Sequence, residues 1–187
     1  MGCSTSKNFT AQPVTQFPPN QKNSIKISFL GKSGVGKSSI TLRYCRNLFL
    51  DSSEATIGAS FLSKHLSYNN KSLKLEIWDT AGQERYKALA PMYYRGSDVV
   101  CLVYDITSRE SFLALEDWMN LVKKDLPNKP VIVVGNKSDL ESERTVPMWE
   151  AVEYSTAKDC LYLETSSKTP YNIDMLFSSA IKLVMKL

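Results

Sequence analysis

The stretch that most constrains the fold of this chain is "GKSGVGKS", residues 31–38. It follows the alternating run "SIKISFL" and matches the pattern G-x-x-x-x-G-K-[ST], which joins a strand to the start of a helix. Glycines at 31 and 36 would let backbone N–H groups curl around phosphate oxygens, and the helix N-terminus adds its dipole. Lys37 is predicted to reach the β- and γ-phosphates, and the Ser38 hydroxyl to ligate Mg²⁺. A glycine-rich turn with this spacing by chance is the alternative, and the flanking strand and helix argue against it.

Strand and helix patterns alternate along the rest of the chain. The apolar runs "VVCLVY" and "PVIVVG" are typical of strands buried on both faces of a parallel sheet, and "SFLSKHLSY" and "KLEIWD" flank the turn "NNK" as a hairpin. Thr107 and Glu110 form a capping-box pattern ahead of "SFLALEDWMNLVKK", and Thr169 with Pro170 predicts the start of the last helix. This order predicts an α/β, doubly wound sheet that binds ligands where the parallel strands end.

Composition narrows the class of protein. A length of 187 residues with 43% hydrophobic and 22% charged residues indicates one globular domain. No apolar run approaches the ~20 residues of a membrane-spanning helix, and residues 1–20 lack the apolar stretch of a secretory signal. The basic residues are scattered and the net charge is only +4, which argues against nucleic-acid binding. The cysteines at 3, 45, 101 and 160 have no metal-ligand spacing, so we expect free thiols in a reducing compartment.

Two polar stretches after later strands predict a preference for guanine. In "NKSD", the Asp139 carboxylate can accept hydrogen bonds from both N1–H and the exocyclic amine of guanine, whereas adenine offers no such pair of donors. The stem of Lys137 would pack on the base, and Asn136 would tie the neighbouring loops together. In "ETSSK", the Ser167 backbone N–H would be offered to guanine O6. Either stretch alone is weak, but the phosphate loop is predicted at the same edge of the sheet.

The stretch "WDTAGQE" supplies the remaining chemistry. Asp79 ends a strand and can hold Mg²⁺ through water, the Gly82 N–H can approach a γ-phosphate, and Gln83 can orient an attacking water. Upstream, Thr56 in "EATIGASF" would give Mg²⁺ a second hydroxyl ligand, although it could also be an ordinary loop hydroxyl.

With these motifs, residues 24–187 resemble the Ras superfamily of small GTPases. Within it, "IGASF", "KLEIWDTAGQE", "YYRGS" and "LVYDIT" are similar to Rab signatures, and "TIGASFLSK" resembles the early-endosomal, Rab-five-like subgroup. Two departures stand out: the phosphate loop carries Lys32 and Ser33, and Ser167 occupies a position where alanine is commoner. Neither removes a group that the chemistry requires.

The resemblance implies a six-stranded, mostly parallel sheet with one antiparallel edge hairpin and about five helices. It implies that GTP or GDP is bound with Mg²⁺ and that Phe49 packs against the guanine. It also implies that effectors recognise an aromatic surface of Phe61, Trp78 and Tyr93, although each of these side chains taken singly could equally be ordinary core. The expected nucleotide-binding residues are Ser33, Gly34, Val35, Gly36, Lys37, Ser38, Ser39, Phe49, Asn136, Lys137, Asp139, Ser166, Ser167 and Lys168. The expected catalytic residues are Gln83, Lys37, Thr56 and Gly82, the metal-holding residues Ser38, Thr56 and Asp79, and the effector surface Ile57, Phe61, Trp78 and Tyr93.

The implied activity is slow GTP hydrolysis, which would switch this protein from a GTP-bound to a GDP-bound state. Bound γ-phosphate would order residues of about 50–62 and 79–95, and hydrolysis would release them. The implied partners are an exchange factor, a GTPase-activating protein and effectors of the GTP state, acting on a monomer. Three alternatives stay open. A P-loop metabolite kinase would have no use for "NKSD", a nucleotide-binding scaffold would have no use for Gln83 and Thr56, and a Ras-like GTPase could serve another pathway.

The first residues predict how the protein reaches a membrane. Residues 1–24 read as a flexible, polar arm ahead of a GTPase domain over 25–187. "MGCSTS" fits M-G-x-x-x-[ST], so Gly2 is expected to be myristoylated and Cys3 to be palmitoylated. Rab proteins usually carry prenylated C-terminal cysteines, and the last twenty residues here contain none, so the chain resembles the N-acylated endosomal Rabs of plants and protists. We therefore expect it on the cytoplasmic face of endosomal or other vesicular membranes.

Overall fold

The computed structural model describes residues 23–51 and 55–185. The predicted N-terminal arm, with Gly2 and Cys3, therefore lies outside the described residues, and the division of the chain at residue 24 stays a prediction. Within the described part, no helix combines the length and apolar character needed to cross a bilayer. The three cysteines in this part, Cys45, Cys101 and Cys160, are unpaired.

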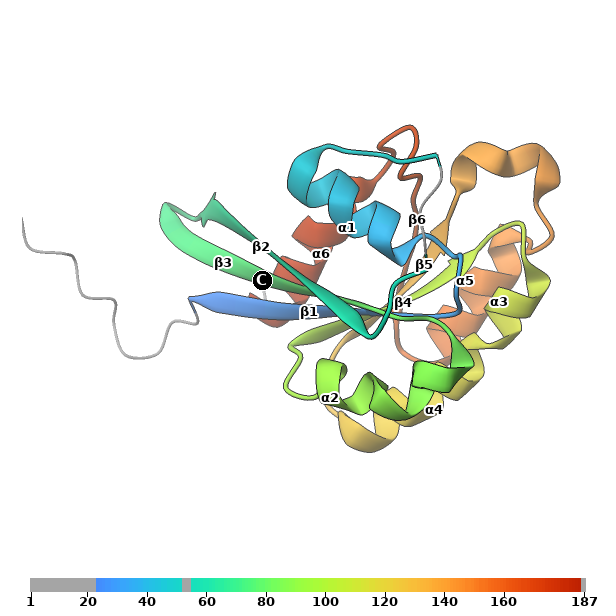
Figure 1. Ribbon diagram of the computed structural model, residues 1–187, viewed down its shortest axis with the longest axis horizontal. Coiled ribbons are helices and arrows are strands. Elements are labelled where there is room, and N and C mark those ends of the chain that lie inside the picture. The colour runs from blue at the N-terminus through green and yellow to red at the C-terminus, as the bar shows by residue number, and fades with distance from the viewer. Residues whose placement is uncertain (1–22, 52–54, 186–187) are drawn as a thin grey trace, which may run out of the picture.

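Strands and helices alternate along the described chain, as the sequence predicts (Figure 1). In chain order they are β1 (Ser24–Leu30), α1 (Lys37–Arg46), β2 (Ala59–Tyr68), β3 (Lys71–Thr80), a 3₁₀ helix (Glu84–Leu89), α2 (Ala90–Tyr94), β4 (Val99–Asp105), α3 (Arg109–Leu113), α4 (Leu115–Asp125), β5 (Val131–Asn136), a second 3₁₀ helix (Ser138–Glu143), α5 (Met148–Ala157), β6 (Leu161–Glu164) and α6 (Ile173–Met185).

The six strands form one sheet in the order β2-β3-β1-β4-β5-β6. β2 pairs antiparallel with β3 at one edge, and the remaining neighbours pair in parallel. The predicted doubly wound sheet with an edge hairpin is thus confirmed. β1 lies between β3 and β4, and the connections on its two sides run over opposite faces of the sheet. The loop after β1 therefore opens at the point where the strand order reverses, which is where such sheets bind ligands.

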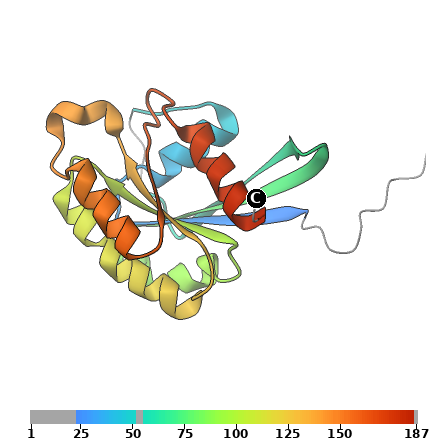
Figure 2. The same ribbon diagram turned by 180° about the vertical axis from the view of Figure 1, so that it is seen from behind.

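Helices cover both faces of this sheet (Figures 1 and 2). α1 and α6 lie on one face, and α2, α3, α4 and α5 lie on the other. Alternate side chains of β4 pack against the two helix layers. Val99, Cys101 and Val103 pack toward α1 and α6. Val100 and Leu102 pack toward α4. Every side chain of this strand is buried, as its continuous apolar run predicts.

Two predicted helix starts are wrong, and each has a local cause. The cap of α3 is Ser108, whose hydroxyl accepts from the Ser111 N–H. The hydroxyl and the N–H of Thr107 both donate to Asp105, which holds Thr107 in the turn after β4, one residue before the cap. The helix predicted across "SFLALEDWMNLVKK" is also divided at Ala114 into α3 and α4, which gives six α-helices in the described chain where about five were expected.

The last helix begins at Ile173, three residues after the predicted proline. The preceding residues form a tight loop instead, because the Ser166 N–H donates to the Tyr171 carbonyl and the Thr169 N–H donates to the Ser166 hydroxyl. Thr169 and Pro170 therefore shape this loop and do not cap the helix.

Phe177 on α6 contacts both α1 and the sheet. It is 1% exposed, its ring stacks on Tyr44 of α1 with centroids 3.6 Å apart, and it lies 5.7 Å from the ring of Phe29 on β1. Buried aromatic contacts of this kind contribute both apolar burial and ring–ring attraction.

Phe177→Ala should lower the free energy of unfolding by about 3–5 kcal/mol, because the side chain is fully buried and leaves a cavity. Met175→Ala on the same helix is the control; it is 51% exposed and should cost less than about 1 kcal/mol. Urea unfolding at one fixed GDP concentration measures both, since bound nucleotide adds to the apparent stability. Equal losses in the two variants would contradict this account of the core.

Candidate functional site

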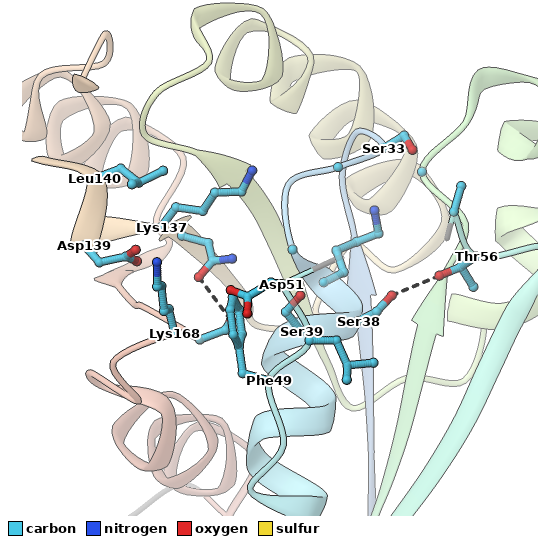
Figure 3. A pocket seen from close by; sticks show the side chains of 18 of the residues that line it. Ser33, Ser38, Ser39, Phe49, Asp51, Thr56, Lys137, Asp139, Leu140 and Lys168 are labelled. Carbon is cyan, nitrogen blue, oxygen red and sulfur yellow. Dashed lines mark hydrogen bonds between the residues drawn. The ribbon is translucent and has the colours of Figure 1, made fainter. Parts of the chain in front are cut away.

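One cavity of about 550 Å³ lies where the parallel strands end, within the range of small-ligand sites (Figure 3). Ser33, Ser38 and Thr56 lie at one end of it, and Lys137, Asp139 and Lys168 lie at the other. The cavity is lined by Ser33, Gly34, Gly36, Lys37, Ser38, Ser39, Phe49, Leu50, Asp51, Ala55, Thr56, Thr80, Gly82, Asn136, Lys137, Asp139, Leu140, Ser167 and Lys168. Its lining thus combines residues from five predicted stretches that are far apart in the sequence.

The loop between β1 and α1 wraps closely around its own lysine. Lys37 is 5% exposed, and its Nζ donates to the carbonyls of Gly31 at 2.9 Å and Lys32 at 2.8 Å. Burial lowers the pKa of Lys37 to about 8, against the opposing effect of the Asp79 carboxylate. An anion held by this loop would favour the charged ammonium. The first turn of α1 carries no acidic residue, so the helix N-terminus also favours an anion.

Ser38, Thr56 and Asp79 lie close together at the end of the cavity formed by the phosphate loop, which we call the phosphate end. The Ser38 hydroxyl donates to Asp79 Oδ2 at 2.6 Å and lies 2.9 Å from Thr56 Oγ1. Asp79 is 2% exposed, and burial raises the pKa of its carboxyl against the effect of the Ser38 hydrogen bond. Asp79 Oδ1 is buried and has no hydrogen-bond partner among the described residues. Two hydroxyls and a carboxylate with an unpartnered oxygen fit a hard cation such as Mg²⁺, which takes few protein oxygens and keeps several waters.

The described residues hold no cluster of three or more His, Cys, Asp or Glu suited to a metal ion. A magnesium site that relies on hydroxyls and substrate phosphates does not need such a cluster.

Gly82 and Gln83 approach the phosphate loop from the end of β3. A Cβ on Gly82 would lie 2.5 Å from Lys37 Nζ and 2.4 Å from the Lys32 carbonyl carbon, so only glycine fits this approach. Gln83 follows it without lining the cavity, and its buried Oε1 has no partner among the described residues. Lys37, Thr56 and Gly82 thus line the cavity, while Gln83 lies next to it in the chain.

Asn136 ties three loops together at the other end. It is 1% exposed; its Nδ2 donates to the Val35 carbonyl at 2.9 Å, and its Oδ1 accepts from Thr165 Oγ1 at 3.1 Å. The Ser167 hydroxyl, at 3.4 Å, is a second and longer donor to the same oxygen. Serine at position 167, where alanine is commoner in the family, therefore adds a contact within the site and removes none.

Two charged side chains next to Asn136 are also held in place. Lys137 has a left-handed backbone with φ of 66°, and its Nζ pairs with Asp105 at 2.6 Å. Asp139 accepts from the Ser166 hydroxyl at 2.5 Å. Val35 and Ser166 do not line the cavity but hold residues that do, and Phe49 forms part of its wall.

Several lining residues are not among the predicted site residues. Ala55 and Thr80 lie inside two of the quoted stretches, next to Thr56 and Asp79. Leu140 follows Asp139, and Leu50 and Asp51 are the two residues after Phe49, so proximity in the chain was the only signal for these positions. Arg43 was missed for a different reason. It lies on α1, in no motif, and contacts the cavity wall from behind.

Three of the four predicted effector residues, Phe61, Trp78 and Tyr93, pack against one another. The Phe61 and Trp78 rings lie 5.2 Å apart, and the Trp78 and Tyr93 rings lie 6.1 Å apart. Phe61 is 48% exposed and Ile57 is 79% exposed. These side chains come from β2, β3, α2 and the segment before β2, so a movement of either flanking segment would alter this surface.

Comparison with known proteins gives one family and several relatives. Residues 26–186 match the Ras family. The chain is 46% identical over 158 residues to Ras-related protein RHN1 of Nicotiana plumbaginifolia and to Ras-related protein Rab5 of Nicotiana tabacum, covering 84% of this chain and 79% of each relative. It is 45% identical over 171 residues to Ras-related protein Rab-5A of Dictyostelium discoideum, covering 89% of this chain and 85% of that relative.

Gly36→Ala should weaken binding of GDP by about tenfold or more, because the added Cβ would lie 2.2 Å from Asn136 Nδ2. Gly96→Ala is the matched control, because Gly96 does not line the cavity. Its φ of 74° is also in the left-handed region, so backbone strain is similar, but its Cβ would meet no atom within 4 Å. Titration calorimetry with GDP measures both variants. Similar affinities would show that the contact between Gly36 and Asn136 does not control the site.

Proposed function

The chain belongs to the Ras family of small GTPases, which bind guanine nucleotides and hydrolyse GTP, and we propose that it is a membrane-anchored Rab-type switch of endosomal traffic. The observation that carries the proposal is the convergence of Ser38, Thr56 and Asp79 beside the phosphate loop. Thr56 belongs to a segment that precedes β2, and its hydroxyl already lies next to the residues that would sense a γ-phosphate. Relatives named Rab5 support the choice of pathway.

Hydrolysis is assigned to the residues that surround the phosphate end. Lys37 and the Gly82 N–H would bind γ-phosphate oxygens, and Gln83 would orient the attacking water for in-line displacement. Mg²⁺, held by Ser38 and Thr56 and through water by Asp79, would neutralise charge on the phosphate oxygens. No arginine is among the residues that line the cavity in the described chain. A partner that supplies an arginine should therefore raise the rate by roughly 10³–10⁵.

The switch would work through the two segments that hold these groups. Loss of the γ-phosphate removes the contacts of Thr56 and Gly82, which frees residues of about 50–62 and 79–95. Because Phe61, Trp78 and Tyr93 lie on or next to these segments, effectors would recognise the GTP state. Exchange factors and GTPase-activating proteins would set the balance between the states.

The membrane anchor is proposed from the motif "MGCSTS". A single myristoyl chain binds a bilayer only marginally, so acylation of both Gly2 and Cys3 is needed for long residence. The described chain begins at the start of β1, and α6 ends beside it, away from the cavity (Figures 1 and 2). An anchor on the N-terminal side would therefore leave the nucleotide site and the effector surface facing the cytosol.

Two substitutions test the switch directly. Gln83→Leu should keep GTP bound but poorly hydrolysed, because the amide that orients water is gone. Ser38→Asn should disturb Mg²⁺ binding and favour the GDP or empty state. In a pull-down from cell extract, the first variant should enrich effectors relative to wild type and the second should lose them.

Single-turnover GTP hydrolysis measured on the same proteins is the companion assay. Equal effector capture by the two variants would identify a nucleotide-binding scaffold. State-dependent capture of partners that are not endosomal would identify a GTPase of another pathway.

Gly2→Ala should abolish membrane association, because glycine at this position is the acceptor of the myristoyl group. Cys3→Ser should leave a weakly attached protein that exchanges on and off membranes. Cell fractionation measures both, and GDP binding should match wild type in each, since neither residue belongs to the site. Recovery of the Gly2→Ala protein in the membrane pellet at the wild-type level would refute this account of the anchor.

A further inference from the structure

All three guanidinium nitrogens of Arg43, on α1, donate hydrogen bonds next to the end of the cavity that is predicted to bind the base. Its Nε donates to the Ser167 carbonyl at 2.8 Å, and one terminal nitrogen donates to the Lys168 carbonyl at 3.3 Å. The other terminal nitrogen donates to the carbonyl and to the side-chain Oδ1 of Asn47, each at 3.1 Å. A planar guanidinium can make this set of bonds, whereas a lysine ammonium cannot reproduce its geometry.

The same side chain also contacts Phe49, which lines the cavity. Its Cζ lies 5.9 Å from the centre of the Phe49 ring, within the range of a cation–π contact. Phe49 is two residues after Asn47, the left-handed residue that caps the C-terminus of α1. Arg43 therefore connects the segment that carries Phe49 to the loop Ser166–Lys168, which is 124 residues away in the chain.

We propose that Arg43 is a positioning residue that holds the loop Ser166–Lys168 against Phe49 and so sets how long guanine nucleotide stays bound. The inference rests on the guanine-binding role proposed for this loop. The Ser167 N–H is the predicted donor to guanine O6, and the carbonyl of the same residue is the acceptor that Arg43 holds. Fixing this backbone before the base arrives removes an entropy cost from binding and slows release.

The chain offers two informative substitutions at this position and a matched control. Arg43→Gln removes the charge and the fork of donors, and Arg43→Lys keeps the charge and the apolar stem but offers a single point of contact. Arg46 is an exposed arginine in the same last turn of α1, so Arg46→Gln controls for losing a positive charge from this end of the helix.

The experiment measures dissociation of nucleotide from the full-length protein, with ribose-labelled fluorescent GDP chased by excess GDP. Arg43→Gln should dissociate about tenfold faster than wild type, the factor expected when one hydrogen bond from a charged group is lost. Arg43→Lys should fall between the two, and Arg46→Gln should stay within about twofold of wild type.

A second nucleotide tests whether the substitution affects the position of the loop Ser166–Lys168 or loosens the fold in general. In 6-thio-GDP, sulfur replaces O6 and is a weak acceptor, so wild type should release it faster than GDP. In Arg43→Gln the ratio of the two dissociation rates should fall toward one, because the donor to O6 is no longer held in place. A merely structural loss would speed both nucleotides by the same factor.

Unchanged GDP dissociation in Arg43→Gln, or an unchanged ratio for the two nucleotides, would overturn the inference while leaving the GTPase assignment intact. If Arg43→Gln does not fold, the same two criteria apply to Arg43→Lys. Failure of the wild-type protein to retain GDP would instead remove the guanine-binding role itself, and the inference with it.

Discussion

The buried amide of Asn136 is the contact on which the geometry of the site depends. It joins the phosphate loop through Val35 to the loop after β6 through Thr165, and it belongs itself to the end of β5. A buried amide with partners on both sides tolerates little displacement, because each unmade hydrogen bond would cost about 1–3 kcal/mol. The two ends of the cavity are therefore fixed relative to each other before any ligand binds. Gly36 must lack a side chain for the same reason, since its Cβ would occupy the place of the amide nitrogen.

Burial of charge sets the chemistry at the phosphate end. Lys37 and Asp79 are both almost fully buried, and burial lowers the pKa of the first and raises the pKa of the second. Both shifts mean that the charged forms lose hydration that the surrounding protein groups only partly replace. A polyanion near Lys37 and a cation near Asp79 would each stabilise the charged form. The site thus favours the phosphate and the metal together, which fits a nucleotide bound as its magnesium complex.

The predicted effector surface is linked to the phosphate-loop end of the cavity through the backbone. Trp78 immediately precedes Asp79 on β3, and Phe61 pairs with Trp78 across the β2–β3 ladder. Tyr93 stacks on Trp78 from α2, which follows the segment that begins at Gly82. A change in the position of Thr56 or Gly82 can therefore reach the exposed aromatic rings through only a few residues. At the other end of the cavity, Arg43 links Phe49 to the loop that is predicted to hold the base.

The sequence by itself determined the class of fold and the order of the motifs. The phosphate loop, "NKSD" and "WDTAGQE" are local patterns: each depends on the spacing of a few residues next to a strand end, and parallel strands bring those ends to one edge. Only the tertiary structure decided which neighbours those residues have. Thr107 has the sequence of a cap, but it is held by Asp105 in the turn before the helix, and Ser108 is the cap. Thr169 and Pro170 belong to the loop that Ser166 closes. Arg43 gave no signal, because it lies on α1 and two of its partners, Ser167 and Lys168, lie after β6, and contacts over that separation exist only once the sheet has formed.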